Sequence, residues 1–325
     1  MSVIRMHILA ESSYVDWLVG EEIVITTTGK SAWESEVRLI TAVGQDSKTL
    51  TLNDSLSFNH VAVSHSHDSY SYDMRAEVGL LTRNVKVIGH AHDDLQKQSF
   101  GGRILIGDYF DGAQQWTGSA RIENAEFYHM GQEGYIELYD PRFAVAYLGT
   151  GSVSDSKPSY VRKNSFKDSF NTAIGVIDAF GLPVSDNVIH GTVEAGIRVK
   201  STDVTIERNL VSFTQARACY QDRVEEMNFD HHGSIEVIEC ISGVVMRDNI
   251  VAGSERSGYS IVGVSCAETD AQWSGNVAHG TLTGVKILPE YVTPAPCTRI
   301  TGFTIYNTHD YGIYAQASSI IEVDM

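Results

Sequence analysis

A short pattern recurs along this chain: an asparagine, then apolar residues, then a glycine about nine residues further on. Clear copies begin at Asn187, Asn209, Asn249 and Asn276, and weaker copies begin at Asn84, Asn124, Asn164 and Asn307. The steps between successive copies are 40, 40, 23, 22, 40, 27 and 31 residues. Self-similarity at such periods indicates a solenoid, and the short steps match one coil of a parallel β-helix. A long step is either one coil with an inserted loop or two coils of which one copy is unrecognised.

The residues between the asparagines favour short strands. Runs of Val, Ile, Thr and Tyr are bounded by Gly, Asn and Ser, which is typical of strands, and no sustained helical period is present. Asparagine suits a coil corner because it tolerates left-handed backbone angles and its amide bonds neighbouring backbone groups. Stacked asparagines would form a ladder. We therefore predict an all-β chain, a right-handed parallel β-helix, with structural corners at Asn187, Asn209, Asn249 and Asn276.

The predicted helix has a length that follows from its rise. At roughly 4.8 Å per coil, about ten to thirteen coils would form a rod on the order of 50–60 Å long. The rival folds are a pair of β-sandwiches or a propeller, which would need tight hairpin turns. Asn-Gly is absent from the sequence, and Asp111 with Gly112 forms the sole Asp-Gly, so the hairpin signals of those folds are missing.

The first 80 residues lack the repeat. Residues 16–25 end in a clear strand, and residues 37–43 and 49–52 suit two more strands across a turn. An uncovered solenoid end would leave core and strand edges open to solvent. We predict that residues 1–80 form a partial β module that caps the N-terminal end of the helix, and that residues 81–325 form the helix.

The charge balance excludes several classes of function. The 325 residues include 24 Lys and Arg against 41 Asp and Glu, a net charge of −17. An anionic surface does not attract duplex DNA or anionic lipid, so we expect no nucleic-acid partner. No apolar run approaches the length of a membrane-spanning helix, so we expect no direct membrane insertion. No cofactor is predicted.

The cysteines favour an oxidising compartment. Cys219, Cys240, Cys266 and Cys297 all lie in the C-terminal third, and none forms a C-x-x-C pair. Zinc-ribbon spacing is therefore absent, and an even number suits two disulfides in a secreted setting. Of the three possible pairings we favour Cys219–Cys240 with Cys266–Cys297; the alternative is four buried free thiols in a cytosolic protein. A sequon predicts glycosylation at Asn53.

Two His-x-His-Asp motifs are candidate metal ligands. They place His65 with His67, and His90 with His92, two residues apart, so that on a strand each pair shares one face. The motifs are 25 residues apart, close to one coil, and could stack. Imidazole with carboxylate suits Zn²⁺ or another first-row metal ion. The alternative is that both motifs lie in polar surface loops.

Several longer segments resemble the fibrocystin and fibrocystin-L family. Residues 16–24 (DWLVGEEIV) and 75–85 (RAEVGLLTRNV) are similar to the end of the eight-glycine domain in that family and in the related cell-surface hyaluronidases. The segments most similar to the fibrocystin branch are 249–259 (NIVAGSERSGY), 273–279 (WSGNVAH) and 297–303 (CTRITGF). The resemblance implies one β-helical segment of a large single-pass membrane protein at ciliary or stereociliary surfaces, anchored by a C-terminal region beyond this sequence. It also supports pairing Cys266 with Cys297.

The resemblance to the hyaluronidase branch bears on catalysis. Residues 100–104 (FGGRI) and 129–132 (HMGQ) are similar to segments of that branch, in which a His-x-His is expected on the next strand. The matching residues here, 142–148 (RFAVAYL), contain no histidine. General acid–base catalysis needs a positioned titratable group, so we predict no catalytic residues and no enzyme activity.

These observations predict a non-catalytic extracellular segment that serves as a rigid spacer and interaction surface in a cell-surface coat. Its ligand would be an extracellular protein or a glycan. The first alternative is a hyaluronidase-like hydrolase of glycosaminoglycans, which the charge of −17 disfavours because these substrates are polyanions. The second alternative is a carbohydrate-binding module without turnover.

Overall fold

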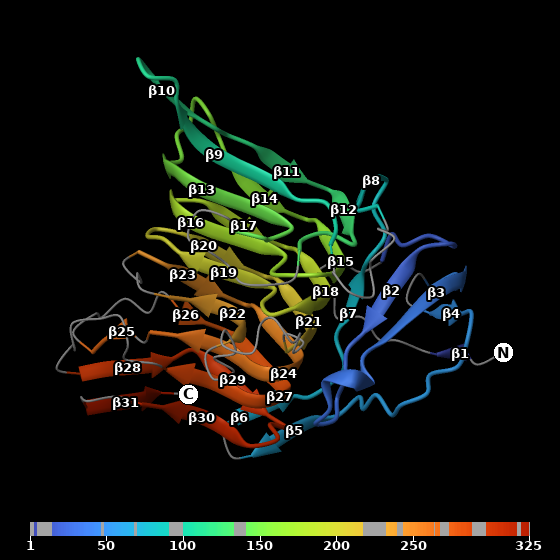
Figure 1. Cartoon of the computed structure of the whole chain (residues 1–325). Helices are drawn as coiled ribbons and strands as arrows, with labels where there is room; N and C mark the ends of the chain where they lie inside the picture. The colour runs from blue at the N-terminus through green and yellow to red at the C-terminus, as the bar shows by residue number, and fades with distance from the viewer. Residues whose placement is uncertain are drawn as a thin grey trace, which may run out of the picture.

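The computed structural model is almost entirely β-structure (Figure 1). It describes residues 3–4, 15–46, 49–67, 70–90, 100–132, 141–216, 232–238, 243–262, 264–266, 273–287, 297–316 and 320–324. Within these ranges it contains no helix long and apolar enough to cross a membrane.

The predicted parallel β-helix is confirmed, and its coils form three faces. Face 1 contains β8 (Val85–Ile88), β12 (Ala125–Tyr128), β15 (Ser165–Ser169), β18 (Val188–Val193), β21 (Leu210–Gln215), β24 (Ile250–Ile261), β27 (Asn276–Ile287) and β29 (Phe303–Tyr306). Face 2 contains β9 (Ile104–Phe110), β13 (Val145–Ser152), β16 (Ile174–Phe180), β19 (Ile197–Lys200), β22 (Gly233–Val237), the second halves of β24 and β27, and β30 (Tyr311–Ala315). Because β24 and β27 continue round the corner, faces 1 and 2 form one 15-stranded sheet.

Face 3 is a sheet of six short strands. It contains β11 (Arg121–Glu123), β14 (Tyr160–Arg162), β17 (Pro183–Ser185), β20 (Thr205–Glu207), β23 (Val245–Arg247) and β26 (Trp273–Ser274). A three-stranded sheet of β25 (Val264–Ser265), β28 (Cys297–Thr301) and β31 (Ile320–Asp324) follows at the C-terminal end. One further strand, β10 (Gln115–Thr117), pairs with β9 as an antiparallel hairpin.

The number of coils differs from the prediction. In the described residues, eight strands succeed one another along face 1, and each step of the asparagine pattern corresponds to one coil. Even a 40-residue step is one coil, because Leu210 lies directly beside Ile250 in the parallel ladder. The prediction of ten to thirteen coils was therefore wrong, because inserted segments lengthen single coils and add no rise along the axis.

The interior of the helix is filled by alternate residues of each strand. The register on face 2 aligns an inward column whose members are 0% exposed: Val145, Ile174, Ile197, Ile235 and Tyr259. On face 1, Phe127 and Phe166 stack with ring centroids 4.6 Å apart. Full burial of each such side chain contributes about 1.5–3 kcal/mol, so the core joins every coil to its neighbours.

A buried ladder of asparagines runs along one corner of the helix. Its members, each at most 1% exposed, are Asn164, Asn187, Asn209, Asn249 and Asn276. The Nδ2 of each of the first four members donates to the Oδ1 of the next member, at 2.9–3.1 Å. The Oδ1 of each of the last four also accepts the backbone N–H of the preceding member, and the Asn164 Oδ1 accepts the Ala125 N–H. The remaining Nδ2 hydrogen bonds go to backbone carbonyls of the coil before, so every amide is satisfied.

The left-handed corner conformation belongs to the residue before each ladder asparagine. Positive φ angles of 51–66° occur at Lys163, Asp186, Arg208, Asp248 and Gly275. The ladder asparagines are therefore selected for their amide hydrogen bonds and not, as the sequence argument proposed, for left-handed backbone angles. Of the weaker copies, Asn164 is a ladder member, whereas Asn124 and Asn307 themselves adopt positive φ.

The N-terminal module, defined here as β1 to β7, is a separate antiparallel sheet with its own core. The sheet contains β1 (Val3–Ile4), β4 (Leu50–Leu52), β3 (Glu36–Val43), β2 (Glu22–Ile25) and β7 (Val78–Leu80) in that order. A short 3₁₀ helix, η1 (Ala32–Glu34), and a hairpin of β5 (Ser64–His67) and β6 (Tyr70–Asp73) complete it. Its buried core is formed by Ile23, Ile25, Ile40, Leu50 and Leu52.

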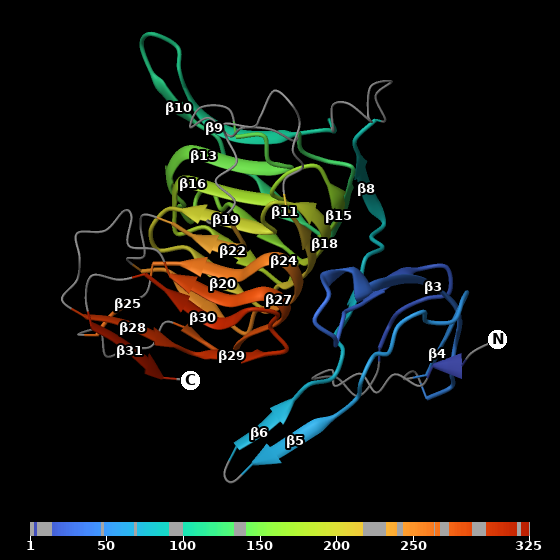
Figure 2. The same ribbon diagram turned by 60° about the horizontal axis from the view of Figure 1, so that its bottom comes forward.

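The module lies beside face 1 and does not cap the helix end (Figures 1 and 2). Its contacts extend from β15, where Lys167 pairs with Glu22 at 2.7 Å, to the residue after β29, where Asn307 donates to the Thr28 carbonyl at 3.0 Å. Glycine permits this approach, because a Cβ on Gly253 would lie 3.1 Å from the Ala32 Cα. The predicted end cap was wrong in position, since the module buries polar groups along several coils.

The ladder yields a stability prediction. Replacing Asn209 by alanine removes the acceptor of the Asn187 amide and the donor to the Val184 carbonyl, both buried. We expect the free energy of unfolding to fall by about 3 kcal/mol, since each orphaned buried polar group costs about 1–3 kcal/mol. Chemical denaturation measures the change. The control Asn84→Ala, at an exposed position outside the ladder, should change stability by less than about 0.5 kcal/mol; equal effects would refute the ladder's role.

Candidate functional site

Residues 142–148, the segment without a histidine, contribute side chains that pack inside the protein. Phe143, Val145 and Tyr147 are each at most 1% exposed. The Tyr147 hydroxyl donates to the Ala120 carbonyl at 2.7 Å, and burial raises the pKa of this phenol. These side chains fill space and satisfy backbone groups.

A charged cluster of the helix lies on face 2. Arg198 of β19 and Glu236 of β22 are register partners, and the Arg198 Nε donates to the Glu236 carboxylate. The Glu236 Oε1 also accepts the Gly233 N–H at 2.9 Å and lies 3.3 Å from the His232 Nδ1. Glu194 approaches the same guanidinium at 3.8 Å. The cluster therefore places one half-buried guanidinium between two nearly inaccessible carboxylates.

The protonation state of Glu236 limits what this cluster can do. Burial alone would raise the pKa of Glu236, but the charge of Arg198 and the hydrogen bond and charge of His232 lower it to about 2. A general acid in glycoside hydrolysis needs a carboxyl with a raised pKa. Glu236 is instead ionised at neutral pH and neutralised by Arg198. The sequence does not reveal this cluster, because Arg198 and Glu236 lie 38 residues apart.

One carboxyl of the described chain does have a raised pKa. Burial raises the pKa of Asp168, although the charges of Lys167 and His129 oppose this. Asp168 belongs to β15 on face 1, where the neighbouring Lys167 pairs with Glu22 of the module. Glu236 belongs to face 2, so the two carboxyls do not form the facing pair that hydrolysis of a glycosidic bond requires.

The junction between module and helix contains a second buried ion pair. The His279 Nε2 lies 3.0 Å from the Glu77 Oε2, and the His279 ring stacks on Tyr306 at 4.6 Å between centroids. Burial would raise the pKa of Glu77, but the charge of His279 and hydrogen bonds from His279 and Thr26 lower it overall. Glu77 lies 202 residues from His279 in the sequence, and no local signal predicts the pair.

The two His-x-His motifs lie far apart. His65 is exposed on β5, in a separate two-stranded sheet, whereas His90 is exposed just after β8 at the edge of the large sheet. Figures 1 and 2 place these strands at opposite ends of the molecule, so the motifs do not stack into one site. The His67 side chain and His92 lie outside the described residues. Metal binding by either motif alone stays a prediction.

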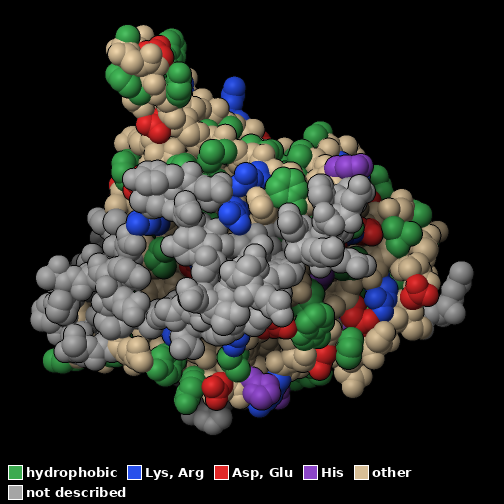
Figure 3. All heavy atoms as spheres, viewed as in Figure 1, with side chains coloured by type: hydrophobic (Ala, Val, Ile, Leu, Met, Phe, Trp, Pro, Cys, Tyr) green, Lys and Arg blue, Asp and Glu red, His purple; other side chains and the backbone are tan. Residues whose placement is uncertain are grey.

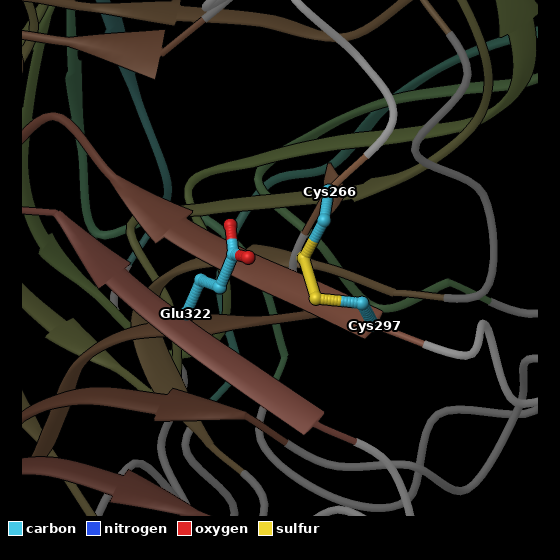
Figure 4. Close-up of side chains that lie close together, drawn as sticks. All are labelled: Cys266, Cys297 and Glu322. Atoms are coloured by element: carbon cyan, nitrogen blue, oxygen red, sulfur yellow. A yellow bond between two sulfur atoms is a disulfide. The ribbon is translucent and has the colours of Figure 1, made fainter.

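The described cysteines form one disulfide. Cys266 and Cys297 are bonded to each other, with Cα atoms 5.5 Å apart, and Figure 4 shows the Glu322 carboxylate beside them. These three side chains are the one cluster of potential metal ligands in the described ranges. The sulfurs are not thiolates, however, and Glu322 pairs with Arg299 at 3.1 Å, so the cluster is structural. Cys219 and Cys240 lie outside the described residues.

Asn53 lies in the turn after β4 with an exposed side chain. Its Oδ1 accepts the Leu39 N–H at 2.8 Å, and its Nδ2 donates to Asp54 at 2.7 Å. An exposed turn position is suited to a glycan, and glycosylation of Asn53 stays a prediction.

Comparisons with known proteins agree with the β-helix and with the resemblance seen in the sequence. The sequence model of the CEMIP beta-helix family matches residues 99–279. Fibrocystin-L of Homo sapiens is 38% identical over 321 residues, and fibrocystin of Mus musculus is 26% identical over 311 residues. These alignments cover 97% and 95% of this chain but 8% and 7% of those proteins, so the chain spans less than a tenth of either. The cell surface hyaluronidase of Danio rerio is 28% identical over 184 residues, 54% of this chain and 13% of that protein.

The Glu77–His279 pair predicts a pH-dependent junction. Because the folded pKa of Glu77 is lowered, its contribution to stability is present above the unfolded pKa and is lost as the pH falls through the folded pKa. We expect Glu77→Gln to lower the free energy of unfolding by about 2 kcal/mol at neutral pH. The difference from the wild type should begin to shrink near pH 4, around the ordinary pKa of glutamate, and should disappear only below the lowered folded pKa of Glu77. Denaturation at a series of pH values measures it.

A control removes an exposed glutamate that also forms an ion pair. Glu322 pairs with Arg299 at the surface, where an ion pair contributes about 0–1 kcal/mol. Glu322→Gln should therefore change stability little at any pH. A Glu77→Gln effect that is equal at pH 3 and pH 7 would contradict the assigned role of the charge.

The disulfide gives a further prediction. Cys266 and Cys297 enclose a loop with a sequence separation of 31, for which cross-linking contributes about 3–4 kcal/mol. We expect the Cys266→Ser, Cys297→Ser double variant to lose stability of that order under oxidising conditions. Reduction of the wild type should abolish the difference. Peptide mapping without reductant should recover the two cysteines in one linked fragment; two free thiols would contradict the assignment.

Proposed function

We propose a non-catalytic role for this chain, which belongs to the CEMIP β-helix family. It would be one extracellular segment of a large fibrocystin-like, single-pass membrane protein, anchored by another region of that protein. There it would act as a rigid spacer and interaction surface in a cell-surface coat of ciliary or stereociliary type. This chain covers less than a tenth of the length of its fibrocystin-type relatives. That coverage supports the view that it is one segment among many.

Rigidity is supported by continuous contacts along the axis. The asparagine ladder joins five successive coils through buried hydrogen bonds. The module reinforces face 1 with the Glu22–Lys167 and Glu77–His279 pairs and with the Trp33 Nε1–H, which donates to Glu255 at 2.9 Å. Bending between coils would have to break several of these bonds at once. The bonds therefore resist bending, as a rigid spacer requires.

The neutralised Glu236 carries the non-catalytic part of the proposal. A hydrolase of the hyaluronidase type would need an accessible acid–base pair. On face 2 the best-buried carboxylate is ionised and bound to Arg198, and the strand of Phe143 and Tyr147 presents apolar packing groups. A hyaluronidase among the relatives makes glycosaminoglycan hydrolysis the competing function to be tested.

The test is incubation of the whole chain with size-defined hyaluronan and chondroitin chains, with and without Ca²⁺. We expect the chain lengths to stay unchanged, as measured by gel electrophoresis and mass spectrometry. The Danio rerio cell surface hyaluronidase serves as the positive control. Shortening by this chain would overturn the non-catalytic proposal. If the Glu236→Gln variant no longer shortened the chains, the activity would belong to face 2. If that variant still shortened them, the activity would lie elsewhere.

A further inference from the structure

The hairpin of β9 and β10 extends beyond the body of the helix (Figures 1 and 2). Only the first part of β9, Ile104 to Gly107, pairs with β13 of the next coil. Beyond this point Asp108, Tyr109 and Phe110 pair with β10 alone. The outer part of the hairpin, residues 108–117, is therefore the projecting tip, and it contributes nothing to the core of the helix.

The tip displays large aromatic side chains to solvent. Tyr109 is 66% exposed, Phe110 is 60% exposed and Trp116 is 53% exposed. Tyr109 and Trp116 are register partners, so their rings share one face of the hairpin. Tyr109 and Trp116 together form a local apolar surface of the kind that marks interaction sites, whereas Phe110 faces the other side of the hairpin.

The tip is held in shape by its own hydrogen bonds. The Asp111 Oδ1 accepts the N–H groups of Ala113 and Gln114 at 2.9 and 2.8 Å. The Asp111 Oδ2 accepts the Trp116 Nε1–H at 2.8 Å, which fixes the indole. This bond, followed by the two backbone bonds, lowers the pKa of Asp111. The surface is therefore organised before any partner binds, which reduces the entropy cost of binding.

The charge of the tip selects among possible partners. Residues 104–117 contain two aspartates and no lysine, arginine or histidine, and Figure 3 shows hydrophobic and acidic side chains on the tip at its upper left. A second copy of this chain would bring the same negative charges together, on a chain of net charge −17. A polyanionic glycan would be repelled in the same way. Aromatic faces beside carboxylates instead complement a cation.

We propose that the projecting tip binds an arginine-containing extended segment of a protein partner. A guanidinium would stack on the Tyr109–Trp116 face and pair with the carboxylate of Asp111, which lies beside the indole. Asp108 faces the other side of β9 and adds to the negative charge that attracts the segment. Arginine suits this arrangement because its planar guanidinium stacks on aromatic rings and is weakly hydrated. The inference rests on the proposed role as an interaction surface and assigns that role a location and a partner chemistry.

The test uses the whole chain and a fluorescent decapeptide of alternating Arg and Ser, with the Lys and Glu versions as comparisons. Binding is measured by fluorescence anisotropy at physiological ionic strength. We expect the Arg peptide to bind more tightly than the Lys peptide and the Glu peptide not to bind. Trp116→Leu should weaken binding of the Arg peptide about fivefold, which corresponds to the roughly 1 kcal/mol of a cation–π contact, whereas Trp116→Phe should weaken it less.

Matched controls separate this site from general attraction to an acidic protein. Tyr311→Leu removes an exposed aromatic ring of β30, at the other end of the helix. Asp108→Asn removes one negative charge from the tip, and Asp310→Asn removes one negative charge next to β30. We expect the tip variants to weaken binding and the β30 variants to leave it unchanged. Thermal unfolding should be unchanged in all of them, because each altered side chain is exposed.

Three results would overturn the inference. The first is equal weakening by the tip and β30 variants, which would show charge attraction without a site. The second is binding of a neutral glucose hexasaccharide that Trp116→Leu abolishes, which would make the tip a glycan site. The third is self-association in sedimentation velocity that Trp116→Leu abolishes. None of these measures chain shortening of glycosaminoglycans, so failure here is distinguishable from failure of the non-catalytic proposal.

Discussion

The fold requires each coil to return to the same corner of the helix, so that its strands align with those of the next coil. A parallel ladder has no hairpin to set its register, and a slip of one residue would turn apolar side chains outward. The buried asparagine ladder meets this requirement at one corner, because each amide bonds both the next asparagine and the backbone of the coil before. A misplaced coil would leave several buried polar groups unsatisfied at once.

A fixed corner allows the remaining sides of a coil to vary. Adjacent members of the ladder are separated by 22 residues in one step and by 40 in another, yet their hydrogen bonds have the same length. The extra residues therefore do not disturb the register of the corner. The β9–β10 hairpin is a described example, since it lengthens its coil and carries exposed aromatic side chains that the core does not use. Differences in coil length, which would disrupt the core of a globular domain, are therefore tolerated in this fold and add exposed surface.

The repeat, the strands and the ladder positions could be predicted from the sequence, because the 22-residue spacing and the buried asparagines are local features. The coil count could not, since a 40-residue step reads equally as one coil or two. The lateral position of the module could not either: it rests on pairs such as Glu77 with His279, 202 residues apart, and on the missing side chain of Gly253. Glu236 lacked any signal because its partner Arg198 lies across an insertion.

The same kinds of residue that serve catalysis in other sites are used here for cohesion. A carboxylate beside an arginine or a histidine can act as a base, a ligand or a structural ion pair, and its environment decides which. Glu236 lies against Arg198 and Glu77 lies against His279, and both carboxyls have lowered pKa values. Breaking such a pair leaves an uncompensated buried charge, so each pair penalises separation of the elements it joins. The carboxylates that hold coils and module together are thereby kept ionised in structural ion pairs.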